Sequence, residues 1–359
     1  MKTHRIPGFD LARAYAIFGM FVVNFNTVFG SVTSTEGWFG VLNLFNGNSS
    51  SLFVILAGMG VSLMSRSASQ NPLQQKQLKA TVLKRSWFLF IFGLLFFLWW
   101  PADILHFYGG YMHIAAFLLF VPRALLLLSA IIAVIVFHIL LIMIPYQNGW
   151  DFQSMLYTDF WTIQGFLRNT IYNGWNPIFP WIAFFFLGMY LGRINWQSPK
   201  TSRLVLAIGS SVYVLNLLAQ TIVKEYTNDA DLIFYFSADY LPPFLPFMLG
   251  TASFAMILIG ICVIIGEKMQ SKLWLQILTN TGQLTLTHYV SHLTIGLLIL
   301  SWITGKTLSL DLIHQAPSNP LLILGFSAFF FLITCFFSYW WKRKFKQGPI
   351  EQCMRWFSK

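Results

Sequence analysis

The sequence predicts an all-α polytopic membrane protein with about ten transmembrane helices and both termini in the cytoplasm. Three observations lead to this fold class. Of the 359 residues, 56% are hydrophobic and only 10% are charged, whereas soluble domains carry about 25% charged residues. The apolar residues form runs about 20 residues long, the length of a bilayer-spanning helix. Basic residues gather at alternate ends of these runs, as they do in membrane proteins.

Ten apolar runs have the length of a spanning helix. They are residues 11–29, 50–65, 86–100, 104–121, 124–145, 177–192, 204–223, 242–266, 283–303 and 321–341. Residues 100–103 alone separate the third run from the fourth, so the two form either a hairpin or one broken unit. The first run follows a polar segment and has no cleavage site, which favours a retained helix. Without a visible repeat or soluble insertion, residues 1–359 are expected to form a single transmembrane domain.

Charge segregation predicts the orientation. Most of the 23 lysines and arginines lie in the two tails and in alternate loops, whereas Arg168, Lys224 and Lys306 lie in the remaining loops. Because short cytoplasmic loops are rich in Lys and Arg, both tails are expected in the cytoplasm. The net charge of +11 is therefore attributed to the membrane and not to nucleic acid. The aromatic loop 146–176 is expected to lie as an amphipathic segment on the outer interface.

Polar residues in the first run are candidates for function, because polar groups are costly at membrane depth. Asp10 and Arg13 are one helical turn apart. They either pair to anchor the helix start, or Arg13 binds an anionic group such as a coenzyme phosphate. Asn24 lies about 21 Å further along the axis, past the midplane, where its amide needs partners. Taken alone, Asn24 fits a packing role better than a catalytic one.

The ninth run carries His288 and His292, four residues apart and hence on one helical face. This spacing can bind a metal, but no third ligand accompanies the pair, so no metal site is predicted. His292 is expected near mid-membrane, roughly level with Asn24. A buried neutral imidazole beside an amide can accept a proton and stabilise a developing charge. Catalysis and packing both remain open for His292.

The segment after the third run contains Asp103, His106 and His113. Their spacing is suited to the polar lining of a cavity that opens outward. Asp103 also fits the simpler role of a helix N-cap.

Four segments resemble, in order, motifs of the YeiB-like bacterial membrane proteins. Residues 5–13, followed by Asn24, resemble the signature R-x-x-x-x-D-x-x-R-G…N, which the heparan-α-glucosaminide N-acetyltransferases share. Residues 102–108 resemble G-D-I-L…Y, residues 282–292 resemble G-x-x-x-L-T-x-Y-V-x-H, and residues 348–351 resemble G-P-x-E. The resemblance implies a transmembrane acyltransferase of the bacterial inner (cytoplasmic) membrane. It would use cytosolic acetyl-CoA or another acyl-CoA.

The resemblance and the charge distribution together assign roles. His292 is expected to act as general base and Asn24 to donate a hydrogen bond to the thioester oxygen or oxyanion. The basic loops concentrate positive charge at the cytoplasmic mouth. The residues expected to bind the coenzyme there are Asp10, Arg13, Arg85 and Arg123. The residues expected to bind the acceptor are Asp103, His106, His288 and Tyr289.

The chain departs from the family pattern at three places. Ala14 and Ala102 stand where the family has glycine, and residues 27–49 lack the histidine that the acetyltransferases carry after the first helix. This last departure favours direct transfer in a ternary complex over an acyl-enzyme. The expected partners are the lipid bilayer and a small-molecule or glycan acceptor, with a homodimer as a further option. The alternatives are a small-molecule transporter or permease without acyl chemistry, and a ligand-binding or scaffold protein.

Overall fold

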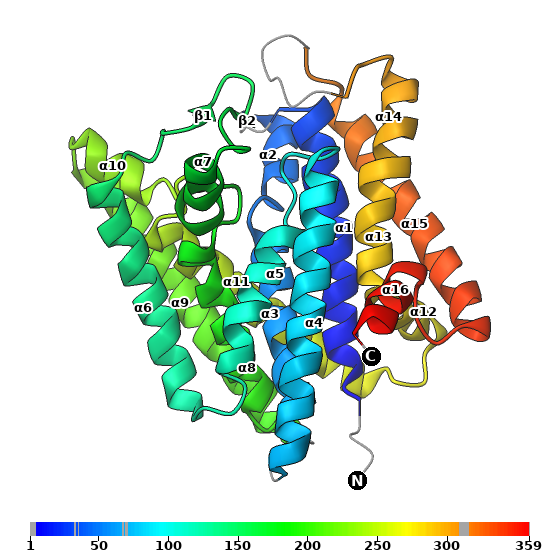
Figure 1. The fold of residues 1–359 in the computed structure, drawn as a ribbon. Coiled ribbons are helices and arrows are strands. Elements are labelled where there is room, and N and C mark those ends of the chain that lie inside the picture. The colour runs from blue at the N-terminus through cyan, green and yellow to red at the C-terminus, as the bar shows by residue number, and fades with distance from the viewer. Residues whose placement is uncertain are drawn as a thin grey trace.

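The structure is a computed structural model that describes residues 5–31, 34, 36–66, 68, 71–308 and 316–358. Long helices stand side by side in a bundle, and the described chain both begins and ends in its lower half (Figure 1). The helices are α1 (Pro7–Phe29), α2 (Gly37–Asn43), α3 (Asn48–Ser65), α4 (Pro72–Phe97), α5 (Leu105–Phe117), α6 (Arg123–Met143), α7 (Ile163–Arg168), α8 (Ile178–Arg193), α9 (Pro199–Tyr226), α10 (Ala230–Phe236), α11 (Leu245–Lys268), α12 (Leu273–Gly282), α13 (Thr285–Ser291), α14 (Leu297–Thr304), α15 (Pro320–Lys344) and α16 (Pro349–Phe357). Two π-helices, η1 (Asn169–Asn173) and η2 (His292–Gly296), and two short strands, β1 (Trp150–Asp151) and β2 (Leu156–Tyr157), complete the elements.

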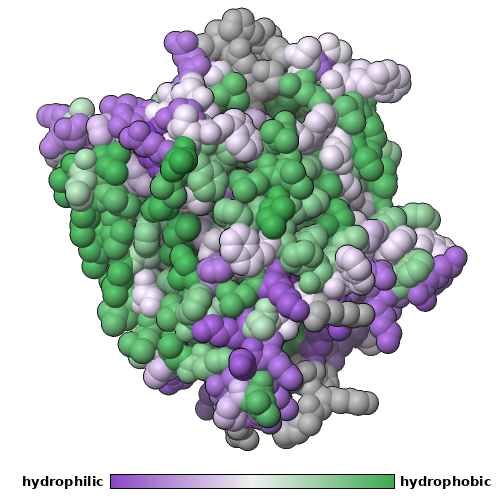
Figure 2. Space-filling model, in the orientation of Figure 1, coloured by the Kyte–Doolittle hydropathy of each residue, from purple (hydrophilic) through white to green (hydrophobic). Residues whose placement is uncertain are grey.

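The prediction of an all-helical, multi-pass membrane protein is confirmed. Within the described residues, eight helical segments are long and apolar enough to cross a membrane. Figure 2 shows a broad hydrophobic band between more polar ends. Two of the predicted spans, 104–121 and 177–192, correspond to the shorter helices α5 and α8. The count of ten spans and the cytoplasmic position of the termini therefore stay predictions.

Local sequence signals mark the starts of several long helices. Proline occupies the first turn of α1, α4, α9, α15 and α16, where it has no hydrogen bond to lose. The Asn71 side chain accepts hydrogen bonds from the first free amides of α4, and Asn319 does the same for α15. Such caps satisfy donors that the helix itself leaves unpaired.

Helix α1 lies in the interior, packed against α3, α11, α12 and α15. Its neighbour α3 crosses α8 at very short range through two glycines. A Cβ atom on Gly58 would lie 2.1 Å from the Phe185 carbonyl oxygen, and one on Gly188 would lie 2.0 Å from that of Ile55. Small residues permit such close helix packing in membranes.

Helices α4 and α5 form a hairpin, which settles the alternative left open by the sequence. Helix α4 ends at Phe97, and α5 begins at Leu105 and runs back alongside it. A Cβ atom on Gly93 would lie 2.2 Å from the backbone nitrogen of His106. This glycine therefore permits the close approach that places residues 98–104 near the middle of the bundle.

Residues 146–176 fold into a compact structure that we call the aromatic cap. It contains β1 and β2, which pair antiparallel, followed by α7 and η1. Trp150, Tyr157 and Phe160 bury their rings with Phe97 in a small separate core. The segment thus folds on itself, with part of its aromatic side chains packed on one another, and its expected position on the outer interface stays a prediction.

Candidate functional site

Asn24 of α1 and His292 of η2 are hydrogen-bonded to each other inside the bundle. The Asn24 Nδ2 atom is 2.9 Å from the His292 Nε2 atom. The other ring nitrogen, Nδ1, is 3.0 Å from the backbone oxygen of His288. A carbonyl only accepts, so Nδ1 carries the proton and the neutral ring accepts the Asn24 amide proton at Nε2. The two residues are 268 positions apart, yet each satisfies the other.

His292 lies in a π-helical stretch that interrupts the helical path from α13 to α14. π-helical turns within α-helices occur frequently at functional sites. The Trp99 indole donates to the backbone oxygen of Leu293 in this stretch, at 2.7 Å. The rings of Phe21 and Phe25 pack against the His292 imidazole. The imidazole is fully buried and held on several sides.

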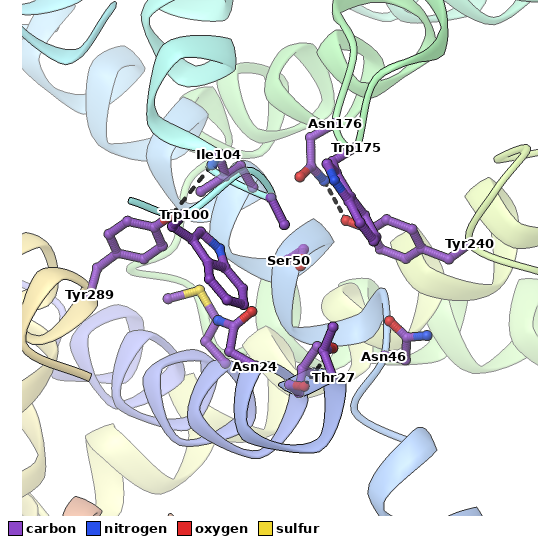
Figure 3. A pocket seen from close by; sticks show the side chains of 13 residues that line it. Asn24, Thr27, Asn46, Ser50, Trp100, Ile104, Trp175, Asn176, Tyr240 and Tyr289 are labelled. Atoms are coloured by element: carbon purple, nitrogen blue, oxygen red, sulfur yellow. Dashed lines mark hydrogen bonds between the residues drawn. The ribbon is translucent and has the colours of Figure 1, made fainter. Parts of the chain in front are cut away.

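Asn24, and not His292, lines a cavity of about 60 Å³ that we call the central cavity. This volume holds about two water molecules. Figure 3 shows Asn24 on one side of the cavity and Asn46 and Tyr240 on another. The lining residues are Met20, Val23, Asn24, Thr27, Asn46, Ser50, Trp100, Ala102, Ile104, Trp175, Asn176, Tyr240 and Tyr289. His292 is linked to this cavity by its hydrogen bond to Asn24.

Tyr289, Asp103 and His106 form a second buried network. The Tyr289 hydroxyl donates to Asp103 Oδ1 at 3.0 Å and accepts from the Ile104 amide at 3.3 Å. Asp103 Oδ2 lies 3.1 Å from both the backbone nitrogen and the Nδ1 atom of His106. The N-cap position of α5 is Ile104, one residue later than predicted, but the Asp103 side chain accepts from an amide of the first turn and also fixes Tyr289.

A second space of about 260 Å³, which we call the arginine pocket, lies toward the end that carries the termini. Arg5, Arg13, Gln283 and Glu351 line it with apolar side chains and Tyr289. Asp10 accepts hydrogen bonds from Arg5 at 2.7 Å, Arg13 at 2.6 Å and Gln283 at 3.2 Å. The predicted Asp10–Arg13 pair therefore exists, with Arg13 24% exposed at the pocket.

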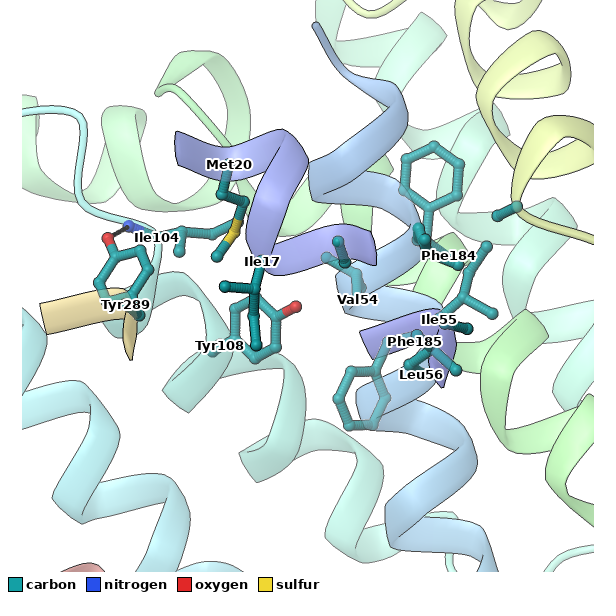
Figure 4. Packing of buried hydrophobic residues seen from close by; sticks show 14 of the residues in the cluster. Ile17, Met20, Val54, Ile55, Leu56, Ile104, Tyr108, Phe184, Phe185 and Tyr289 are labelled. Carbon is teal, nitrogen blue, oxygen red and sulfur yellow. Dashed lines mark hydrogen bonds between the residues drawn. The ribbon is translucent and has the colours of Figure 1, made fainter. Parts of the chain in front are cut away.

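Tyr289 lines both the central cavity and the arginine pocket. Figure 4 shows Tyr289 close to Ile104 and Met20, with Ile17 and Tyr108 nearby. These residues belong to one buried hydrophobic cluster. Tyr289 is thus part of a partition of mostly apolar side chains between two spaces that each contain polar groups.

Asp103 and His106, predicted to bind the acceptor, are fully buried and line neither space, and three further predicted site residues lie elsewhere. Arg85 contacts Ser358 and Met64, and Arg123 is exposed at the start of α6; neither lines the arginine pocket. His288 bonds Ser338 at 2.7 Å and lines neither space. Its predicted contact with an acceptor finds no support in this arrangement, because both the ring and Ser338 are buried.

The sequence did not single out the aromatic and amide residues of the central cavity. Asn176 donates to the Tyr240 hydroxyl at 2.5 Å, and both residues come from loops. Tyr240 lies in the loop between α10 and α11. Glu351 was noted only within the G-P-x-E motif, yet it contacts the start of α13. In the described part of the chain, no group of three His, Cys, Asp or Glu residues is arranged to hold a metal.

Two family models match the chain. Residues 5–235 match the model described as heparan-alpha-glucosaminide N-acetyltransferase, catalytic. Residues 188–359 match a family described as a protein of unknown function, DUF418, to which the YeiB-like proteins belong. No curated protein matches the chain. The resemblance predicted from the four motifs is therefore confirmed, and the chain belongs to the heparan-alpha-glucosaminide N-acetyltransferase catalytic family.

Proposed function

We propose that the protein is an acyltransferase of the bacterial inner membrane with both termini in the cytoplasm. It would take an acyl group, acetyl in the simplest case, from cytosolic acyl-CoA. The acceptor would be a hydroxyl or amine, on a sugar or envelope glycan, at the opposite side of the membrane. The family match supports a transferase-type enzyme. The observation that carries the proposal is the Asn24–His292 hydrogen bond beside the central cavity.

The arginine pocket suits the phosphates of the coenzyme. Arg5 and Arg13 share the single carboxylate of Asp10, which fixes their guanidinium groups at this wall, while the formal charges of the two arginines, Asp10 and Glu351 balance. The second carboxylate of the pocket, Glu351, accepts hydrogen bonds from α13. Arginine binds phosphate with charge-assisted hydrogen bonds. From this pocket the pantetheine arm would have to pass Tyr289 to bring the thioester to Asn24.

One rearrangement would prepare both catalytic groups. The acceptor hydroxyl or amine replaces the Asn24 amide at His292 Nε2, and the freed amide donates to the thioester oxygen. His292 takes the acceptor proton while the new C–O or C–N bond forms and the C–S bond breaks. The imidazolium then returns the proton to the coenzyme thiolate. General base catalysis contributes about 10²–10⁴ in rate, and an oxyanion donor about 10²–10³.

Thiol release from acetyl-CoA by the purified protein tests this function. We expect slow release without acceptor and faster release with a sugar acceptor. His292→Gln keeps a hydrogen-bonding partner for Asn24 but cannot serve as a base at neutral pH, so activity should fall about 10²–10⁴-fold. Acetyl-CoA binding should be retained. A failure of the wild-type protein to bind acetyl-CoA, or full activity in His292→Gln, would sink the acyltransferase mechanism.

A transporter is the second candidate. The specific observation in its favour is that Tyr289 lines both the arginine pocket and the central cavity. Two spaces that share one wall residue between them also suit alternating access. Proteoliposomes separate the two functions. Uptake of a labelled sugar without any acyl-CoA would support transport, whereas acylation that requires acyl-CoA would support the enzyme.

A further inference from the structure

A third space opens at the end of the bundle opposite the termini. It has a volume of about 550 Å³, and we call it the amide cleft. Residues from α2, the start of α3, α9, the loop after α10 and the start of α11 form its walls. Its polar lining residues are Asn43, Asn46, Asn48, Tyr213, Asn216, Gln220, Asp239, Tyr240 and Thr251.

The amide cleft adjoins the central cavity. Asn46 and Tyr240 line both spaces. Figure 3 shows these two side chains across the central cavity from Tyr289. A ligand seated in the cleft therefore lies next to the space that Asn24 lines, with Asn46 and Tyr240 at the boundary.

Several cleft residues are fixed by the protein itself. Asn43 accepts from Asn26 at 3.0 Å and donates to the Ser34 backbone oxygen at 2.7 Å. The Asn216 amide donates to the Pro246 backbone oxygen at 3.0 Å. These contacts hold the walls in place before any ligand binds, and a preformed site lowers the entropic cost of binding.

Other cleft residues keep their hydrogen-bonding groups available. The side-chain amides of Asn46 and Gln220 and the hydroxyl of Tyr213 make no hydrogen bond to the part of the chain that the structure describes. An amide offers both donors and an acceptor, as a tyrosine hydroxyl does. This matches the hydroxyl groups of a polyhydroxylated ligand, which also donate and accept.

The charge of the cleft restricts the ligand. Asp239 is its one charged lining residue among those that the structure describes, and no described lysine or arginine lines it. An anionic ligand would lose hydration without gaining a counter-charge, which is unfavourable, and would be repelled by Asp239. A neutral hydroxyl group incurs neither penalty, and an ammonium group is attracted.

We propose that the amide cleft binds the acceptor, and that the acceptor is a neutral or amino-bearing polyhydroxylated compound. Phosphate, sulfate and carboxylate groups are excluded from the portion that enters the cleft. The inference rests on the proposed acyl transfer, because it assigns the acceptor to one side of the central cavity. It goes beyond that function by giving the acceptor a location and a charge.

Steady-state thiol release tests the proposal with three acceptors of similar size. These are a neutral disaccharide, an amino disaccharide and a sulfated disaccharide, each with saturating acetyl-CoA. The first two should stimulate release, and the sulfated compound should be at least about tenfold less effective. Gln220→Leu and Asn46→Leu should each raise the acceptor KM about three- to tenfold and leave the KM for acetyl-CoA unchanged. Gln220→Lys should improve the sulfated acceptor.

Gln153→Leu is the matched control, because it removes an exposed amide from the aromatic cap without touching the cleft. Preference for the sulfated acceptor, or unchanged acceptor KM in both leucine variants, would overturn the cleft assignment. If no acceptor stimulates thiol release, the cleft assignment is tested by measuring the binding of the neutral disaccharide by calorimetry. Binding that Gln220→Leu weakens supports the cleft although acyl transfer has failed, and absence of binding overturns the cleft as well.

Discussion

At the residue scale, Asn24 connects the buried imidazole to the central cavity. Its amide satisfies His292 Nε2 at 2.9 Å, and its side chain also lines the cavity. A packing role and a role in binding are therefore not alternatives for this side chain. The hydrogen bond keeps the buried imidazole ordered, and in the proposed mechanism the acceptor takes the place of the amide.

Replacing Asn24 tests both roles. In Asn24→Ala the Nε2 atom of His292 loses its partner, which costs about 1–3 kcal/mol for a buried polar atom. We expect a lower melting temperature and a fall in acyl transfer of about 10²–10³-fold, with acetyl-CoA affinity retained. Scanning fluorimetry and thiol release measure the two effects.

Asn26→Ala provides the control for Asn24→Ala. The Asn26 amide bonds Ser31 and Asn43 and lines neither the central cavity nor the arginine pocket. Because Asn26 also holds Asn43 of the amide cleft, its loss should lower stability and raise the acceptor KM, but it should leave the rate per folded molecule at saturating acceptor nearly unchanged. Equal losses of activity in the two variants would argue against a specific role for Asn24.

At the element scale, the C-terminal helix α16 secures the motif helix α13. Glu351 Oε1 accepts from the amides of Leu286 at 2.7 Å and Thr287 at 3.0 Å, and Oε2 accepts from the Thr287 hydroxyl at 2.5 Å. These amides lie in the first turn of α13, where a carboxylate is stabilised by the helix dipole. Glu351 follows Thr287 by 64 residues in the sequence, yet this contact lets it stabilise the first turn of α13. Helix α13 carries Tyr289 and continues into His292.

Loss of this contact should loosen α13. In Glu351→Ala two amides and one hydroxyl lose their acceptor, so hydrogen exchange in residues 285–292 should accelerate at least about tenfold, as about 1.4 kcal/mol of local stability implies. Transfer activity should fall as well. Gln352→Ala, on the neighbouring exposed position of α16, should change neither quantity. Unchanged exchange in Glu351→Ala would show that other contacts position α13.

The α3–α8 crossing makes a separate prediction about stability. Alanine at position 188 would place a methyl group about 2.0 Å from the Ile55 backbone oxygen, so the helices must separate. Gly188→Ala should lower the melting temperature in detergent. A Cβ atom on Gly325 of α15 would meet no neighbouring atom within 4 Å, so Gly325→Ala should be neutral or slightly stabilising. Equal melting temperatures for the two variants would contradict close packing at the crossing.

At the scale of the whole molecule, the structural features that follow from a periodic sequence pattern could be predicted, whereas features that depend on tertiary contacts could not. Run length identified the long helices, and the rise per residue placed Asn24 and His292 at similar depth. The lengths of α5 and α8 depend on where the chain turns inside the bundle. The position of Arg85 depends on the docking of α16, and the aromatic cap on contacts among rings. None of these leaves a periodic signal in the sequence.

The arginine pocket, the central cavity and the amide cleft are adjacent in this order, because each neighbouring pair shares lining residues. Tyr289 joins the arginine pocket to the central cavity, and Asn46 and Tyr240 join the central cavity to the amide cleft. Two substrates could thus enter from opposite ends and meet beside Asn24. In such an arrangement the partition at Tyr289 must let the thin pantetheine arm of the coenzyme through while it excludes bulk water.

Truncation of Tyr289 should breach this partition. The Tyr289 ring is 2% exposed, and its hydroxyl is held by Asp103 and Ile104. Tyr289→Ala removes the ring, so water should reach the thioester and hydrolysis of acetyl-CoA without acceptor should rise relative to transfer. Tyr289→Phe keeps the ring and loses only the hydrogen bonds, so it should be less stable but keep hydrolysis low. The ratio of thiol release without acceptor to release with acceptor measures the effect, and an unchanged ratio in Tyr289→Ala would place the barrier between the two spaces elsewhere.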